Sequence, residues 1–239
     1  EFLGAVELLA PKSLLGFSAS PWRSVKGETI SLFDSIAFSY TFEDALHDGV
    51  LVPWRILGWD GKDVDDSVDG ATVGMIRRLA RGPGIVSAKS IVDAEEFAAS
   101  LTSDGIPATA VHSKLRPREV RSRVARLVDG DPDGPPRCLV HVSLLQEGVD
   151  VPALRWLGMR RPVGSTIRFV QELGRVLRTA PGKTVATILD PRDIYGRLGL
   201  NHDPKVGPAE AIEAAMMREA GDGVGPPRFV IDEEAPRAV

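Results

Sequence analysis

The residues with the clearest chemical potential lie in the segment RRPVGSTIRFVQELGRVLR. Its apolar spacing predicts a helix from about Ser165 to Arg178, with Gln171, Arg175 and Arg178 on a separate stripe at i, i+4 and i+7. Two guanidiniums one turn apart suit a polyphosphate whose charge shifts during γ-phosphoryl transfer. A solvated helix face is the alternative. Gly174, which costs about 1 kcal/mol relative to Ala inside a helix, indicates close packing here.

Two other segments place polar residues directly after apolar runs. In EGVDVP, Gly148 permits a close backbone approach and Asp150 offers a carboxylate to a ribose hydroxyl or a basic partner. In SASP, Ser18 and Ser20 place two hydroxyls before a proline. Either segment alone can equally be an ordinary turn, since Gly, Asp, Ser and Pro all favour turns.

The elements that must position these residues alternate regularly from Gly82 onward. Helical patterns separate five short β runs, and the apolar residues of these runs predict strands that are buried on both faces. Such an alternation is typical of an α/β domain with a parallel sheet covered by helices. Ligands of such sheets bind at the carboxyl ends of the strands, which draws attention to the segments that follow them. The expected strands are GIVSA (84–88), ATAVH (108–112), RCLVHV (137–142), LRWLG (154–158) and VATILD (185–190).

The composition is ordinary for a globular protein. The chain has 239 residues, of which 43% are hydrophobic and 26% charged. No uncharged apolar stretch approaches the roughly 20 residues of a membrane-spanning helix, so we expect no membrane partner and a cytoplasmic location. Cys138, the single cysteine, lies in an apolar run and is expected to be a buried thiol. The four histidines show no metal-ligand spacing, so no metal site is expected on them.

The charge is unevenly distributed along the chain. The formal net charge is -4, yet between positions 112 and 126 a cluster of cations faces only Glu119. A basic face on an acidic protein is compatible with binding to phosphate backbones, although a solvated helix face fits the charge equally well. The cluster comprises Lys114, Arg116, Arg118, Arg121, Arg123 and Arg126.

In combination these segments resemble the superfamily 2 helicases and translocases. SASP followed by WR looks like motif III, EGVDVP like motif V, and QELGRVLR like the QxxGRxxR of motif VI. GIVSA and VHSKL resemble motif IV and the nucleic-acid-contacting segment after it. The similarity runs from about Leu14 to Asp190 and is greatest to bacterial and phage DEAD/DEAH-type proteins that resemble restriction-enzyme motor subunits. It implies a RecA-like parallel sheet with helices on both faces, the second lobe of a P-loop NTPase.

The resemblance also implies roles for individual residues. Arg175 and Arg178 would be arginine fingers that stabilise charge on the γ-phosphate of ATP. Gln171 would position the nucleotide, and Gly148 and Asp150 would line the same cleft. The remaining roles fall on residues near the nucleic-acid phosphates (Ser87, His112, Ser113 and Lys114) and on residues that couple hydrolysis to movement between lobes (Ser18 and Ser20).

Two motifs of such motors are not found in their expected places. The first lobe needs a P-loop, GxxxxGK[ST], and an acidic box that holds Mg²⁺. APGKT has the Gly-Lys-Thr, but Leu177 stands where the first Gly belongs, and FVIDEEAP lies near the last residue. The sequence starts at Glu1 rather than Met, so we expect ATP and Mg²⁺ to be held mainly by a first lobe outside this sequence.

These features predict four regions. Residues 1–25 would be the last strand of an incomplete first lobe, 26–80 a linker and insertion, 81–200 the helicase C-terminal domain, and 201–239 a helix and loose tail. The expected function is the C-terminal lobe of an ATP-dependent DNA helicase or translocase, inactive without a P-loop lobe, with RNA as the alternative substrate. A non-catalytic nucleic-acid-binding or regulatory module and the motor part of a restriction system are the other candidates.

Overall fold

A computed structural model describes residues 8–17, 38, 40–58, 67–142 and 150–198. The chain divides into two compact units, one formed by Thr41–Ala215 and the other by Glu1–Tyr40 with Met216–Val239. All strands of the sheet and all described residues of the candidate site belong to Thr41–Ala215. The helix expected near residues 210–218 lies outside the described residues.

A six-stranded sheet with the order β1-β6-β5-β2-β4-β3 forms the centre of this unit. Every neighbouring pair is parallel, so the α/β class with a parallel sheet is confirmed. All five strands expected from the sequence are present, and the segment expected to be a linker adds β1 at one edge. The strands are β1 (Trp54–Gly58), β2 (Pro83–Ser87), β3 (Ala108–Val111), β4 (Arg137–His141), β5 (Trp156–Gly158) and β6 (Ala186–Asp190).

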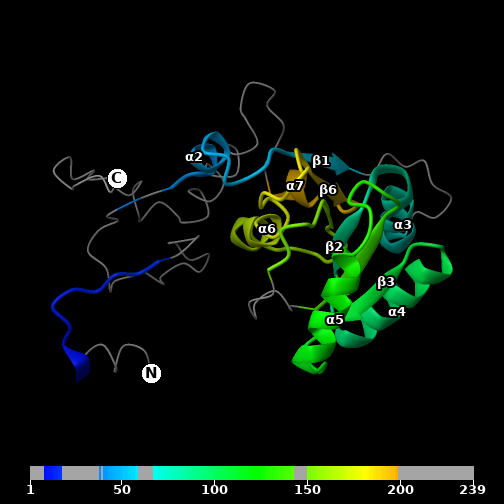
Figure 1. The fold of residues 1–239 in the computed structure, drawn as a ribbon, viewed down its shortest axis with the longest axis horizontal. Coiled ribbons are helices and arrows are strands. Elements are labelled where there is room, and N and C mark those ends of the chain that lie inside the picture. Colours follow the sequence, from blue (N-terminus) through cyan, green and yellow to red (C-terminus); the bar gives the residue numbers. More distant parts are fainter. Residues whose placement is uncertain (1–7, 18–37, 39, 59–66, 143–149, 199–239) are drawn as a thin grey trace. The chain divides into compact units, whose positions relative to one another are not determined.

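Helices cover both faces of the sheet, as Figure 1 shows for α4 and α5 beside β2 and β3. The chain moves from β2 across β4 to β3 and then back to β4. Right-handed crossovers therefore place the two connecting helices, α4 and α5, on opposite faces. The described helices are α2 (Phe42–His47), α3 (Val68–Leu79), α4 (Ile91–Ser103), α5 (Pro117–Val128), α6 (Thr166–Leu173) and α7 (Ile194–Arg197).

The core between α3, α4 and the sheet is closed around Trp156 on β5. The indole is fully buried and its Nε1 donates a hydrogen bond to the carbonyl of Gly82 at 3.1 Å. Gly84 on β2 lies directly against the ring, and a Cβ at this position would come within 1.9 Å of the indole Cε2. The missing side chain at Gly84 is therefore what lets β2 and β5 pair beside the tryptophan.

Two expected elements differ from the structure. The helix predicted to reach Arg178 ends at Leu173 and is capped by Gly174. A Cβ on Gly174 would meet only ordinary contacts with carbonyl oxygens at 3.5 and 3.8 Å, so this glycine marks the helix end and not a close approach. The apolar run SLLGF (13–17), part of the region where residues 1–25 were expected to form a strand, has no strand in its described residues, and Phe17 is 96% exposed.

Candidate functional site

Arg178 lies on an extended segment beyond the end of α6. It forms an isolated antiparallel bridge with Leu51, and the neighbouring Val52 N–H donates to the Leu177 carbonyl at 2.8 Å. Because Leu51 and Val52 precede β1, Arg178 lies beside the start of that strand. The expectation that Gln171, Arg175 and Arg178 share one helical stripe is therefore wrong, since only Gln171 is helical.

The structure brings Arg178 together with Asp150, two residues that the sequence predicted for one site. An Nη1 of Arg178 forms an ion pair with Oδ1 of Asp150. The two side chains are 51% and 55% exposed, respectively. The guanidinium is thus partnered by a carboxylate of the same chain and remains open to solvent on its other side.

Arg175 lies in a more enclosed place, beside the carboxylate of Glu172. Its Nε is 3.5 Å from Oε2 of Glu172, and its side chain is 19% exposed. Burial lowers the pKa of Arg175 from its ordinary value, while the charge of Glu172 opposes that shift. Gln171 is exposed on the preceding turn of α6. Arg175 and Arg178 thus occupy different environments, one half-buried and one half-exposed.

Glu172 is the centre of a buried charged cluster that the sequence did not predict. Its Oε1 accepts a hydrogen bond from Arg161 Nη2 at 3.0 Å, and its Oε2 lies 3.8 Å from Nε2 of His141. Burial raises the pKa of Glu172, against the lowering effect of Arg175 and Arg161. Burial, and then the charges of Arg175 and Arg161, lowers the pKa of His141 to about 3, so this imidazole is neutral.

Lys183 lies in the APGKT segment and is also buried. Its Nζ donates hydrogen bonds to the carbonyls of Arg178 at 2.7 Å and Pro152 at 3.1 Å. Burial, followed by the charge of Arg155, lowers its pKa to about 8. A lysine held by two backbone carbonyls is unlike a P-loop lysine, which must reach phosphate oxygens.

The residues predicted to contact nucleic acid divide into two pairs. Ser87 is 1% exposed, and its Oγ accepts the backbone N–H of Arg161 at 3.4 Å. His112 is 4% exposed, with Nε2 3.2 Å from Oε1 of Glu95. Ser113 and Lys114 are exposed in the turn between β3 and α5. Only the second pair is accessible to a phosphate backbone in this structure.

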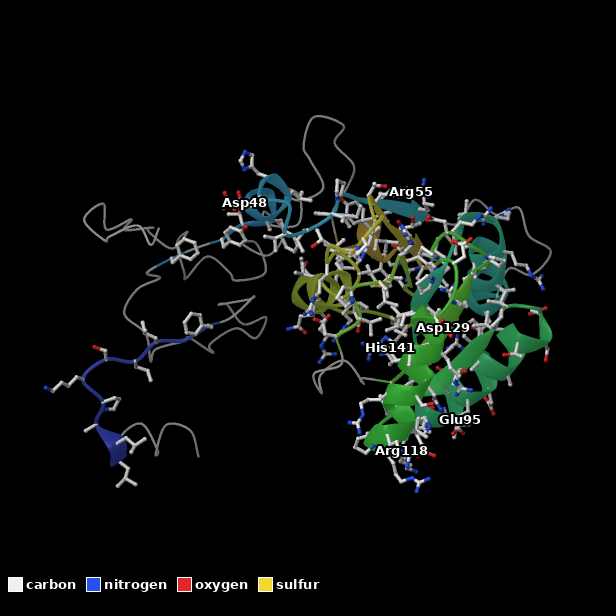
Figure 2. All side chains as sticks on the ribbon, viewed as in Figure 1. Asp48, Arg55, Glu95, Arg118, Asp129 and His141 are labelled. Atoms are coloured by element: carbon white, nitrogen blue, oxygen red, sulfur yellow. The ribbon has the colours of Figure 1, made fainter. Side chains whose placement is uncertain are left out.

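The exposed cations of the predicted basic cluster continue from that turn along α5. Figure 2 shows Arg118 at one end of α5, where its side chain extends away from the sheet. Arg123 is the exception, because its Nη1 donates inward to the Ala110 carbonyl at 2.5 Å. We call the exposed set the basic face; it consists of Lys114, Arg116, Arg118, Arg121 and Arg126.

Ser18, Ser20 and Gly148, also predicted for the site, lie outside the described residues. The functional candidates that the sequence missed are Glu172, Arg161, His141 and Lys183. In the QELGR segment Glu172 is one charged residue between Gln171 and Leu173, and Lys183 stood out only as part of an incomplete P-loop motif. Neither local sequence pattern indicated that Glu172 or Lys183 would be buried beside the other site residues.

Comparison with known families finds a similarity over the part of the chain that carries Arg175 and Arg178. Residues 71–180 match the family described as the helicase conserved C-terminal domain. This part of the chain is similar to helicase C-terminal domains. The match runs from within α3 to just beyond Arg178, so it includes Arg175, Arg178 and the basic face. The resemblance to a helicase C-terminal domain that the sequence predicted is thereby confirmed.

Relatives of the chain occur in viruses. The chain is 26% identical over 229 residues to "Putative helicase 22" of the Sulfolobus islandicus filamentous virus, covering 81% of this chain and 39% of that protein. It is 25% identical over 204 residues to a 51.5 kDa protein of a Lactococcus phage, covering 77% of this chain and 44% of that protein. The chain therefore spans about two fifths of the length of these curated relatives.

Among solved structures, the chain is similar to the E. coli DEAD-box protein SrmB bound to the regulator of ribonuclease activity A. The TM-score is 0.46 at 19% identity, over 62% of this chain and 82% of that one. Within the described part of the chain, no helix has both the length and the apolar character needed to cross a bilayer.

Proposed function

We propose that this chain is the second lobe of an ATP-dependent DNA helicase or translocase and completes the ATP site of a P-loop lobe. The observation that carries the proposal is Arg178, a half-exposed guanidinium paired with Asp150 inside a helicase C-terminal domain. In such a motor the two lobes close on ATP and reopen after hydrolysis. RNA is the alternative nucleic-acid substrate to DNA.

The exposure of Arg178 suits it to a phosphate that arrives from another lobe. An ion pair between half-exposed side chains contributes only about 0–1 kcal/mol, so exchange of Asp150 for a phosphate oxygen costs little. The guanidinium can then stabilise the charge that develops on the γ-phosphoryl group, which for an arginine finger raises the rate by several powers of ten. Asp150 would accept a hydrogen bond from a ribose hydroxyl of the nucleotide, or keep Arg178 in position when the cleft is open.

Arg175 is proposed as the second guanidinium of the site, held from behind by Glu172. The buried carboxylate is itself held by Arg161, so the position of Arg175 depends on that cluster. Gln171, exposed one turn earlier on α6, is proposed to contact the nucleotide.

The described residues of this chain do not by themselves form a site for Mg²⁺. Among the described residues no group of three or more His, Cys, Asp or Glu side chains converges as metal ligands. Mg²⁺ and most of the triphosphate would therefore be bound by the P-loop lobe, with this chain supplying cations to the γ-phosphate.

The nucleic acid is proposed to bind along Ser113, Lys114 and the basic face. Lysine and arginine side chains that contact phosphates release counterions, which provides affinity without reading sequence. Ser87 and His112 are buried beneath this surface in the described structure, so their proposed part is to support the turn that presents Ser113 and Lys114.

The test is steady-state ATP hydrolysis, with and without single-stranded DNA, by this chain combined with its P-loop lobe. Arg178→Ala is expected to lower kcat at least about 1000-fold, the loss typical of an arginine finger, while DNA affinity is retained. Arg77→Ala is the matched control, because Arg77 is 50% exposed and pairs with Asp104 at 2.9 Å on another part of the domain. Equal turnover by the two variants would remove the finger assignment.

A non-catalytic nucleic-acid-binding module is the second candidate. It is favoured by the internal pairing of both arginines, Arg178 with Asp150 and Arg175 with Glu172, which neutralises them without a nucleotide. DNA binding by the chain together with no ATP hydrolysis in the presence of the P-loop lobe would support this candidate over the motor.

A further inference from the structure

Lys183 joins the two segments that carry the Asp150–Arg178 pair. Its Nζ donates to the carbonyl of Arg178 itself, at 2.7 Å, and to the carbonyl of Pro152, two residues after Asp150, at 3.1 Å. The two acceptors are distant in sequence and approach one amine from both sides. We infer that Lys183 is a positioning residue that holds Arg178 and Asp150 in register; this role rests on the proposed function of Arg178.

The amine is well placed for such a role because its own backbone is fixed. The Lys183 N–H donates to the Ala180 carbonyl at 3.0 Å and closes the turn that contains Gly182. Gly182 has a φ of +68°, a conformation that favours glycine, and its carbonyl accepts a hydrogen bond from Arg155 Nη1 at 3.0 Å. The turn is therefore anchored to the start of β5, and Lys183 extends the anchor to Arg178.

Arg178 has one further backbone attachment among the described residues, on its other side. The bridge with Leu51 and the bond from Val52 N–H to the Leu177 carbonyl attach it to the segment before β1. Without the lysine, the Arg178 carbonyl loses a charge-assisted donor, while the segment keeps the bonds from Val52 N–H to the Leu177 carbonyl and from Leu177 N–H to the Leu173 carbonyl. The first consequence is local opening around Leu177 and Arg178, before the sheet is affected.

Both protonation states of the amine can serve this purpose. An ammonium has three N–H donors and a neutral amine has two, which is the number of carbonyls that Lys183 contacts. Substitutions that keep the chain length but remove the donors are therefore the informative ones. Lys183→Met removes both hydrogen bonds, and Lys183→Gln keeps a neutral donor on a shorter side chain.

The first experiment is amide hydrogen exchange on the full 239-residue chain. Lys183→Met is expected to speed exchange at the Val52 amide about tenfold relative to the Met159 amide, which bonds to Leu189 in the sheet. Lys183→Gln should show a smaller increase. Arg137→Met is the control, because Arg137 also donates to two backbone carbonyls, those of Leu127 and Asp131, at 2.6 and 2.9 Å. A Val52 response equal to that of the control would overturn the inference.

The second experiment is ATP hydrolysis by the chain combined with its P-loop lobe. Lys183→Met should lower kcat about tenfold or more, with KM for ATP changed less than about threefold, because the arginine acts mainly in the transition state. Arg137→Met should retain the kcat of the unmodified motor. If Arg178→Ala lowers kcat but Lys183→Met matches the control, the lysine inference alone fails. If Arg178→Ala leaves kcat unchanged, the proposed function fails and the role of Lys183 falls with it.

Discussion

Arg175, Arg178 and Lys183 lie close together in the sequence but differ in how deeply they are buried. Arg178 is half-exposed and can exchange its partner, whereas Lys183 is 7% exposed and bound to carbonyls. The difference has an energetic consequence, because a buried amine gives up hydration that two neutral carbonyls replace only in part. The buried position of Lys183 therefore lowers the free energy of unfolding, whereas the half-exposed position of Arg178 does not.

This cost predicts a pH dependence of stability. Burial lowers the folded pKa of Lys183 to about 8 from the ordinary 10.5. Between these values the unfolded chain binds a proton that the folded chain lacks, so the free energy of unfolding contributed by this group rises with pH. Below pH 8 both states are protonated and the contribution is at its minimum.

Urea unfolding at pH 7.5 and pH 9.5 checks this sign. The difference in unfolding free energy between the natural chain and Lys183→Met is expected to move in favour of the natural chain at the higher pH. Because other titrating groups are common to both proteins, their effects cancel in the difference. A constant difference across this range would contradict the assignment of the lowered pKa.

At the scale of elements, the strands were predictable and the end of α6 was not. Each β run is apolar on both faces and bounded by turns, which is enough to predict a buried parallel strand. In the α6 segment the apolar spacing continues from Val170 through Leu173 to Leu177, and all three are buried. Leu177, however, lies beyond the helix, because the chain leaves the helix at Gly174 and Arg178 then pairs with Leu51. That pairing depends on a residue far away in the sequence.

The run SLLGF is a second case in which the local sequence alone did not decide the structure. Its apolar residues predict a strand, yet Leu15 is 77% and Phe17 96% exposed without strand pairing. A strand exists only with a neighbour that accepts and donates its backbone hydrogen bonds. Local sequence reports the preference and says nothing about the neighbour.

The close approach of β2 and β5 gives a prediction about an element. Gly84→Ala would place a methyl group within 1.9 Å of the Trp156 ring, and overpacking of this kind costs about 1–3 kcal/mol. Gly58→Ala on β1, where nothing lies within 4 Å of the new Cβ, is the control and should change stability by less than about 0.5 kcal/mol. Urea unfolding of both variants measures the effect, and equal stabilities would contradict it.

The basic face gives a second prediction at this scale. Arg118→Gln is expected to weaken binding to single-stranded DNA and to reduce the slope of log affinity against log salt by about 1. Arg77→Gln removes the same charge from α3 and should leave the slope unchanged. Fluorescence anisotropy over a series of salt concentrations measures both. Equal slopes for the two variants would show that α5 is a solvated face.

At the scale of the whole molecule, the net charge and the residues of the candidate site can both be compared with the proposed function. The net charge of -4 opposes general attraction to nucleic acid, so the proposed binding would depend on the few cations that α5 presents together. The described residues likewise offer guanidiniums for a phosphate but no convergent ligands for a metal. The guanidiniums are what the proposed function requires of this chain.

The corresponding prediction concerns the chain by itself. Without a P-loop lobe it should show no ATP turnover above background, with or without DNA, because nothing among its described residues cradles the β- and γ-phosphates. A coupled ATPase assay measures this. Robust hydrolysis by the chain alone, abolished by Arg178→Ala, would show that the nucleotide site is complete within it.

The bridge between Leu51 and Arg178 has a mechanical consequence. A tension applied to the chain before β1 acts through Leu51 and Val52 on the backbone that presents the guanidinium, without passing through the sheet. A shift of Leu51 and Val52 by one residue would change the register of the bridge. The Arg178 guanidinium would then move away from the γ-phosphate position of the proposed site. In the proposed function, a shift of the segment before β1 would therefore change the position of Arg178.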